Sequence, residues 1–438
     1  MSMLELGFLS FPVLLVMIFM RAPIGLAMML CGIGGLYFAM GGSNIFLSKL
    51  KSETYSTFSS YSLTIIPMFL LMGQFATLSG MSKSLFKAAE SWLGHRKGGV
   101  AMAAVGACAG FGAICGSSLA TAATMSKVAL PELRRYGYSG GFSTATLAAG
   151  GTLGILIPPS VILVIYAILT EQNIAKLFLA AFVPGILAAI GYMITISIYV
   201  RLYPDAAGTR ERVPYGERMR ALLDVWPVLL VFGLVVGGIY LGWFTPTEGA
   251  AVGAAGTGII ALLSGNLTWR VFVESILSTA TNTAMIFFII LGAGFYNSFL
   301  ALTQVPQELS MAVANSGLGP WTILVIILAF YLVFGCLMDS LSMILLTIPI
   351  FFPLISQLDF GLSQEHLAIW FGILVLIVVE VGLITPPVGM NLFVINGMDR
   401  STPMIETYKS VMFFVGSDIV RVIILVLFPS ITLFLLPG

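Results

Sequence analysis

Long apolar runs recur along this chain, and they restrict its fold more than any other feature of the sequence. Several approach the length that a helix needs to cross the roughly 30 Å hydrocarbon core of a bilayer, about 20 residues. Only 9% of the 438 residues are charged, whereas a soluble domain carries about 25%. The sequence therefore predicts an all-helical, polytopic integral membrane protein in which residues 1–438 form a single membrane domain.

Composition argues against several classes of function. The formal net charge is +1, which leaves no basic face for binding nucleic acid. The two histidines, His95 and His366, lie in polar stretches and form no HExxH motif, and the sequence has no Walker A loop. We therefore expect neither an enzyme nor a bound cofactor. Without an ATP site, transport would draw on an ion gradient.

A polar stretch at residues 201–222 lies near the chain midpoint and holds five of the 20 lysines and arginines. Positive charge collects on the cytoplasmic loops of membrane proteins. We therefore expect a cytoplasmic linker there, between a first repeat half at 56–200 and a second at 223–438. At the N-terminus, Glu5 precedes the first apolar run and Arg21 follows it. This charge pattern is unlike a signal peptide and predicts a retained first helix.

An internal repeat supports the two halves. The pattern Gly-x-x-x-Pro-Pro occurs at 154–159 and again at 382–387. Two upstream matches, at nearly the same separation, are Ser118 with Ser340 and Pro131 with Pro353. Corresponding segments interrupted by glycine and proline mark the binding site in transporters built from inverted repeats. We expect an inverted repeat here, although hydrophobicity alone does not give the orientation of the halves.

Two segments of the first half could offer oxygen atoms to a small cation. Irregular backbone at membrane depth survives only inside protein or beside a wet cavity, so a chain reversal near Gly116 and Ser117 would present carbonyls and hydroxyls. In the first Gly-x-x-x-Pro-Pro copy, Pro158 cannot donate the hydrogen bond that the Gly154 carbonyl would otherwise accept. The alternatives are a tight helix crossing of small residues and a kink that serves packing alone.

The second half adds ionisable and hydroxyl groups. Thr385 brings a hydroxyl to the second Pro-Pro break. Asp339 and Glu380 lie in apolar runs, where a carboxylate is costly and functional by default. Asp339 could instead lie in water at a hairpin tip, and Glu380 could hold two helices together. In the first half, Lys127 could attract a carboxylate substrate or extend to a lipid headgroup.

One further segment indicates a helix start. Glu248 suits the first turn of a helix, and we expect Thr247 to cap it.

In order and spacing, five segments resemble the large membrane subunit of the tripartite ATP-independent periplasmic (TRAP) transporters. They are GAICGSSLATAATMSKVALPELRRYGYS (112–139), GTLGILIPPSVILVIYA (151–167), LFLAAFVPGIL (177–187), FTPTEGAAVGA (244–254) and VGLITPPVGMNLFVINGM (381–398). The resemblance covers nearly the whole chain. It implies a multi-pass protein of the bacterial cytoplasmic (inner) membrane, with a scaffold and a transport domain that moves as an elevator. Two re-entrant hairpins and two broken helices would carry the site.

The resemblance also implies how transport is powered and which partners take part. Sodium would be the coupling ion, and a periplasmic substrate-binding protein would deliver a small organic acid. A small four-helix membrane subunit, here a separate polypeptide, would brace the scaffold within the lipid bilayer.

The resemblance assigns residues to these sites. The expected sodium-binding residues are Gly116, Ser117, Ser118, Gly154, Ile157, Pro158, Gly335, Gly382, Thr385 and Val388. The expected substrate-binding residues are Asp339, Ser340 and Lys127. Sialic acid members look like GSGPAT where this chain has GSSLAT, and many members have Gly where it has Ser126-Lys127. Both departures speak against a sialic acid substrate without naming another.

Two rival classes remain. A stand-alone sodium–carboxylate symporter or antiporter of the wider ion transporter superfamily would use similar hairpins. An intramembrane enzyme would need a nucleophile–base or metal constellation, which the sequence does not display.

Overall fold

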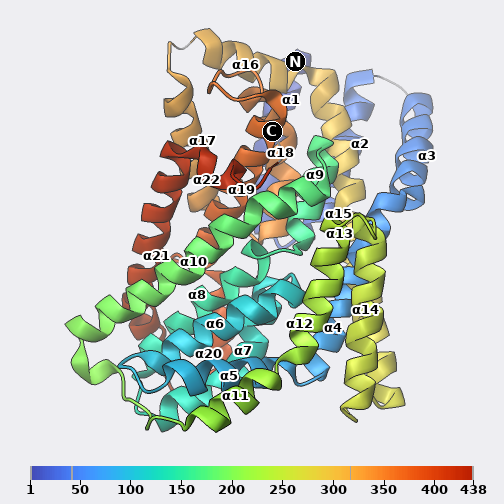
Figure 1. Ribbon diagram of the computed structural model, residues 1–438. Coiled ribbons are helices and arrows are strands. Elements are labelled where there is room, and N and C mark those ends of the chain that lie inside the picture. The colour runs from blue at the N-terminus through green and yellow to red at the C-terminus, as the bar shows by residue number, and fades with distance from the viewer. Residues whose placement is uncertain (1, 41–42, 316, 437–438) are drawn as a thin grey trace.

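The computed structural model describes residues 2–40, 43–315 and 317–436, and every regular element in these ranges is helical (Figure 1). Seven helical stretches there are long and apolar enough to cross a membrane, or eight if a bent pair counts as one span. They are Tyr61–Leu78, Ile174–Leu202, Tyr215–Tyr240, Pro246–Leu263, Trp269–Thr303, Gln364–Gly382 and Met404–Leu427, with the bent pair Gly140–Leu156 and Val161–Thr170. The expected all-helical, polytopic fold is confirmed.

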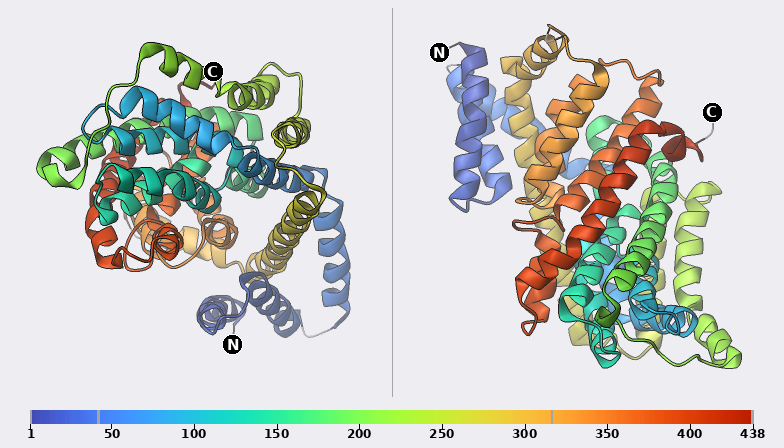
Figure 2. Two further views of the ribbon diagram at one scale, coloured as in Figure 1. Left: turned by 90° about the horizontal axis from the view of Figure 1, so that it is seen from below. Right: turned by 90° about the vertical axis from the view of Figure 1, so that its left-hand side faces the viewer.

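One group of helices packs around two long contacts, between α2 and α15 and between α4 and α14. Its members are α1 (Met3–Phe19), α2 (Ile24–Met40), α3 (Ser43–Ser59), α4 (Ile65–Leu78), α12 (Trp226–Phe232), α13 (Gly238–Tyr240), α14 (Pro246–Leu263) and α15 (Trp269–Thr303). Glycine makes the α2–α15 approach possible, since a Cβ on Gly292 would lie 2.2 Å from the Gly25 carbonyl oxygen. In both views of Figure 2 the dark-blue N-terminal helices lie at the edge of the molecule.

The second group contains the same series of elements twice: a short helix, a helix pair, an interrupted helix and a long helix. The first series is α5 (Met81–Leu93), α6 (Gly99–Cys115), α7 (Ser118–Arg135), α8 (Gly140–Leu156), α9 (Val161–Thr170) and α10 (Ile174–Leu202). The second is α16 (Val305–Asn315), α17 (Pro320–Gly335), α18 (Ser340–Ile355), α19 (Gln364–Gly382), α20 (Met390–Met398) and α21 (Met404–Leu427), followed by α22 (Pro429–Leu433). In Figure 1, α5 lies at the bottom and α16 at the top.

The two helix pairs α6–α7 and α17–α18 are the hairpins expected from the sequence. Three of their helices, α6, α17 and α18, have only 16 or 17 residues, which is short for a membrane crossing of about 20. Each pair turns back within the protein. The position of these turns defines the site described below.

The linker at 201–222 is more ordered than a polar loop. After α10 ends at Leu202, a short turn at Pro204–Ala206 leads to α11 (Tyr215–Leu223), which packs against α5. The Arg210 guanidinium lies 2.9 Å from the Glu90 carboxylate. Arg218 is buried, with its guanidinium 5.7 Å from the centre of the Trp92 ring. Part of the positive charge thus attaches the linker to the first half.

The start of α14 corrects one expectation. Thr245, not Thr247, caps the helix: its hydroxyl accepts a hydrogen bond from the Glu248 amide at 3.3 Å, and its own amide donates to the Glu248 carboxylate at 2.8 Å. Pro246 occupies the first turn. The threonine three residues before the glutamate therefore completes the reciprocal capping box, and Thr247 falls inside the helix.

Candidate functional site

Both hairpin tips open on one cavity of about 330 Å³ between the two groups of helices. The tips contribute residues 116–120 and 339–341, and the interrupted helices contribute Ile155, Val161, Ile162 and Leu383. The opposite wall belongs to α4 and α15, through Leu70, Asn282, Met285 and Ile286. Two hairpins from different halves of the chain and a wall of the other helix group thus enclose the same space.

The first tip is a reversal built on glycine. Gly116 ends α6 with φ +64°, a left-handed conformation that a side chain would disfavour. Ser117 then caps α7, because its hydroxyl accepts a hydrogen bond from the Ala120 amide at 3.4 Å. A Cβ on Gly116 would lie 3.1 Å from the Pro159 carbonyl oxygen, so the tip lies directly against the first break.

The first break approaches the hairpin backbone to backbone. A Cβ on Gly112 would lie 2.5 Å from the Gly154 Cα, and a Cβ on Gly154 would lie 2.7 Å from the Ser117 carbonyl oxygen. The same Cβ on Gly154 would lie 2.3 Å from the Thr121 hydroxyl, which is buried and makes no hydrogen bond within the described part of the chain. A carbonyl and an unpartnered hydroxyl therefore converge on Gly154, and both are hard oxygen donors of the kind that a small cation uses.

Thr121 is a candidate that the sequence interpretation missed. It follows Ser117 by four residues, so the two share one helix face. That spacing within the serine- and threonine-rich stretch 117–124 was the available signal.

The second tip uses an aspartate where the first uses a serine. Asp339 caps α18 by accepting hydrogen bonds from the Ser342 amide at 3.0 Å and from the Ser342 hydroxyl at 2.6 Å. It is half-buried and lines the cavity. The next residue, Ser340, donates a hydrogen bond to the Glu380 carboxylate at 2.6 Å. The second tip therefore presents a carboxylate to the cavity, and the first presents hydroxyls.

The second break repeats the close glycine contact. A Cβ on Gly382 would lie 2.7 Å from the Gly335 Cα, as Gly112 approaches Gly154 in the first half. Pro386 and Pro387 leave two carbonyls without their helical donors, but both carbonyls accept hydrogen bonds from other amides. The Gly382 oxygen accepts from the Thr385 amide at 3.0 Å, and the Leu383 oxygen accepts from the Asn391 amide at 3.1 Å. Each carbonyl keeps one lone pair for a cation.

The predicted residues fall into three places. Gly116, Ser117, Ser118, Asp339 and Ser340 line the cavity. Gly154, Ile157 and Pro158 form the first break, and Gly335, Gly382, Thr385 and Val388 meet at the second. Lys127 lies apart: it is exposed on α7, about 13 Å along the helix from Ser118, and does not line the cavity.

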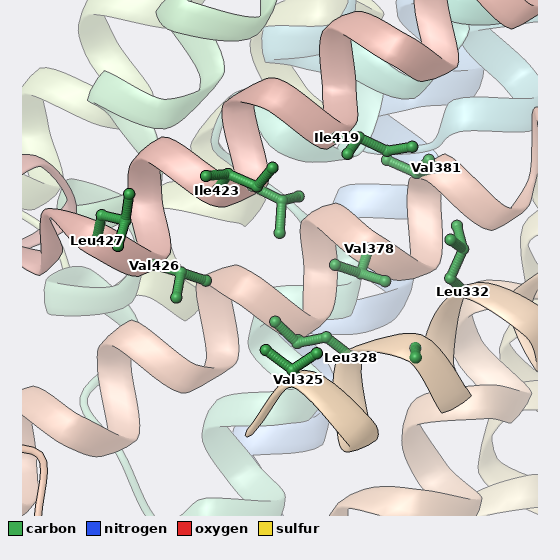
Figure 3. Close-up of a pocket in the computed structure, with 11 residues that line it drawn as sticks. Val325, Leu328, Leu332, Val378, Val381, Ile419, Ile423, Val426 and Leu427 are labelled. Atoms are coloured by element: carbon green, nitrogen blue, oxygen red, sulfur yellow. The ribbon is translucent and has the colours of Figure 1, made fainter. Parts of the chain in front are cut away.

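A second hollow of about 370 Å³ lies between α17, α19 and α21 (Figure 3). Every lining side chain is aliphatic: Val325, Leu328, Ala329, Leu332, Val378, Val381, Ile419, Val422, Ile423, Val426 and Leu427. It offers no polar side chain to orient a charged solute. The cavity at the hairpin tips, which Ser117, Ser118, Asp339 and Ser340 line, is the candidate transport site.

Comparison with known proteins agrees with this geometry. Residues 11–431 match the family described as the tripartite ATP-independent periplasmic transporter, DctM component. The chain belongs to this family. It is therefore a transporter subunit rather than an enzyme, and a multi-pass protein of the bacterial inner membrane. A tripartite transporter has further components with which a DctM subunit works.

Individual relatives match most of this chain. The C4-dicarboxylate TRAP transporter large permease protein DctM of Pseudomonas aeruginosa is 36% identical over 88% of both chains. The protein of the same name from Vibrio cholerae is 31% identical over 98% of this chain and 96% of its own length. The sialic acid TRAP transporter permease protein SiaT of Haemophilus influenzae is 30% identical over 98% of this chain and 68% of its own.

A solved structure shares the fold. The YdaH transporter from Alcanivorax borkumensis superposes with a TM-score of 0.65 over 89% of this chain and 90% of its own, at 13% identity.

Proposed function

We propose that this DctM subunit is the permease of a sodium-driven transporter that takes up a small organic acid from a periplasmic binding protein. The observation that carries the proposal is the single cavity that both hairpin tips share with the opposite helix group. A site formed jointly by matching segments of two halves is the arrangement by which secondary transporters alternate access.

The cavity suits a carboxylate. Helices α7, α9 and α18 begin at Ser118, Val161 and Ser340, all of which line it. Helix N-termini carry partial positive charge and free amides, so they favour anions. A volume of about 330 Å³ fits a small solute. Relatives named for C4-dicarboxylates make that class the first to test.

Sodium coupling is supported by the oxygen atoms at the two breaks. At the first, the Ser117 carbonyl and the Thr121 hydroxyl converge on Gly154. At the second, the Thr385 hydroxyl donates to the Val381 carbonyl at 2.6 Å, and its oxygen lone pairs stay available to a cation. Neutral carbonyls and hydroxyls are the ligands that a hard monovalent ion accepts.

The arrangement also supports an elevator built from inverted repeats. The cavity lies at the border between the two helix groups, so sliding the hairpin group along α4 and α15 would carry the solute across. The matched elements α5 and α16 lie at opposite ends in Figure 1, as an inverted pair would. The group around α4 and α15 would be the scaffold, braced by a small four-helix membrane subunit.

The coupling proposal predicts that uptake follows the sodium gradient. The test is uptake of labelled C4-dicarboxylate into liposomes that contain the permease and its small subunit, with the binding protein added outside. An inward sodium gradient should drive accumulation, and potassium on both sides should abolish it. Equal uptake in potassium contradicts sodium coupling. Full uptake without the binding protein favours the stand-alone symporter instead.

A further inference from the structure

Glu380 is a buried carboxylate between the two hairpin tips. It lies on α19, is 0% exposed, and accepts a hydrogen bond from the Ser340 hydroxyl of the second tip at 2.6 Å. Ser118, at the first tip, is its other polar neighbour. One carboxylate therefore stands within reach of both tips, immediately behind the cavity that they line.

One oxygen of this carboxylate makes no hydrogen bond among the described residues. Its Oε1 receives the Ser340 hydrogen bond, whereas Oε2 is buried and makes no hydrogen bond within the described part of the chain. A buried polar atom of this kind destabilises the folded protein as long as it stays unsatisfied. A second ligand of Oε2 would remove that destabilisation.

The charge is uncompensated as well. None of the ion pairs among the described residues involves Glu380. The charged side chain that acts on it is Asp418, which is also acidic and lies 2.8 Å from its own partner, Arg421. A buried carboxylate anion without a cationic neighbour is strongly disfavoured, so either a bound cation or a proton must neutralise Glu380.

We propose that Glu380 anchors a further sodium ion, held by Oε2 and the hydroxyl oxygens of Ser118 and Ser340. This inference rests on the proposed sodium-driven transport and adds a charged site to the two neutral breaks. An ion bound by both tips holds them together, because moving either tip away would release the ion and leave the Glu380 charge buried without a partner. Binding at this site thus couples the two hairpins across the substrate cavity.

The test is Glu380→Gln, which keeps the shape and the acceptor for Ser340 but removes the charge. Dual-label uptake of ²²Na⁺ and substrate by the reconstituted complex should show one sodium ion fewer per substrate than the wild type. Glu380→Asp should keep the wild-type ratio with a several-fold higher half-saturating sodium concentration. Glu406→Gln, at an exposed carboxylate on α21, is the matched control and should change neither quantity.

A second measurement does not depend on transport. Sodium chloride, compared with choline chloride, should stabilise the purified wild-type complex against heat with a steeper dependence on concentration than Glu380→Gln. An unchanged sodium-to-substrate ratio and an unchanged stabilisation curve in Glu380→Gln would overturn the site. The site would also be overturned if Glu380→Gln lost proton flux but kept the wild-type number of sodium ions per substrate, because the carboxylate would then carry a proton. A wild type without any sodium response contradicts the proposed function itself.

Discussion

Thr385 shows how one side chain can adjust a helix break. Its amide donates to the Gly382 carbonyl at 3.0 Å and its hydroxyl donates to the Val381 carbonyl at 2.6 Å. These two bonds replace part of the helical hydrogen bonding that is lost because Pro386 has no backbone N–H. The threonine oxygen then lies at the break and accepts no hydrogen bond from the described residues. The residue therefore both stabilises the break and offers it an oxygen ligand.

Thr385→Val should weaken sodium binding. The substitution removes one oxygen at nearly constant volume, so uptake should need about tenfold more sodium for half-maximal rate, which corresponds to about 1.4 kcal/mol. The measurement is uptake against sodium concentration with expression checked. Thr77→Val is the control, because the Thr77 hydroxyl makes the same bond to a carbonyl four residues earlier, Gly73, at 2.9 Å. If the sodium curve of Thr385→Val is unshifted, the break is a kink that serves packing and does not bind sodium.

At the scale of elements, each hairpin meets its broken helix through a pair of glycines. Gly112 lies against Gly154 in the first half, and Gly335 lies against Gly382 in the second. Helices that approach without side chains between them bring their carbonyls together. The repeated Gly-x-x-x-Pro-Pro pattern therefore fixes both a break and the partner surface on which a hairpin lies.

Gly112→Ala should disturb this contact. Its Cβ would lie 2.5 Å from the Gly154 Cα, which is backbone and cannot rotate away, so overpacking should cost about 1–3 kcal/mol. We expect a lower melting temperature in detergent and slower uptake. The control on the same helix is Gly106→Ala, where the nearest atom is the flexible Met193 Cε at 3.5 Å. Equal effects of the two variants would argue against a special contact at Gly112.

The sequence predicts the breaks and hairpins well because proline and glycine act locally. The residues of the tips and breaks follow from such local signals. Contacts between distant segments do not: nothing near Gly112 marks it among 47 glycines as the partner of Gly154. For the same reason the sequence could not show that Thr121 lies against Gly154 or that Ser340 reaches Glu380. The separation of Lys127 from Ser118, by contrast, follows from the helical rise along α7 alone.

At the scale of the whole molecule, basic segments from distant parts of the sequence gather at one end. The Ser139 amide donates to the Ala206 carbonyl at 3.0 Å, and the Arg210 amide donates to the Gly94 carbonyl at 3.0 Å. Arg134, at the end of α7, pairs with Asp399 after α20. The linker, the α5–α6 turn, the end of α7 and the end of α20 therefore share one face. Its positive charge predicts that this face is cytoplasmic.

Labelling of an introduced cysteine tests this orientation. Thr209 is exposed in the linker, and the four native cysteines are buried, so a Thr209→Cys variant has a low background. Glu365→Cys is the opposite-end control, because Glu365 lies 2.6 Å from Lys176 at the start of α10, whereas the linker follows the end of α10. A membrane-impermeant thiol reagent should label Glu365→Cys in spheroplasts and label Thr209→Cys only after lysis. Positive-inside orientation is the physical reason, since basic loops near membrane spans stay on the side of synthesis. Rapid labelling of Thr209→Cys from outside would contradict the predicted orientation. The α16 end of the molecule, rather than the linker, would then lie in the cytoplasm.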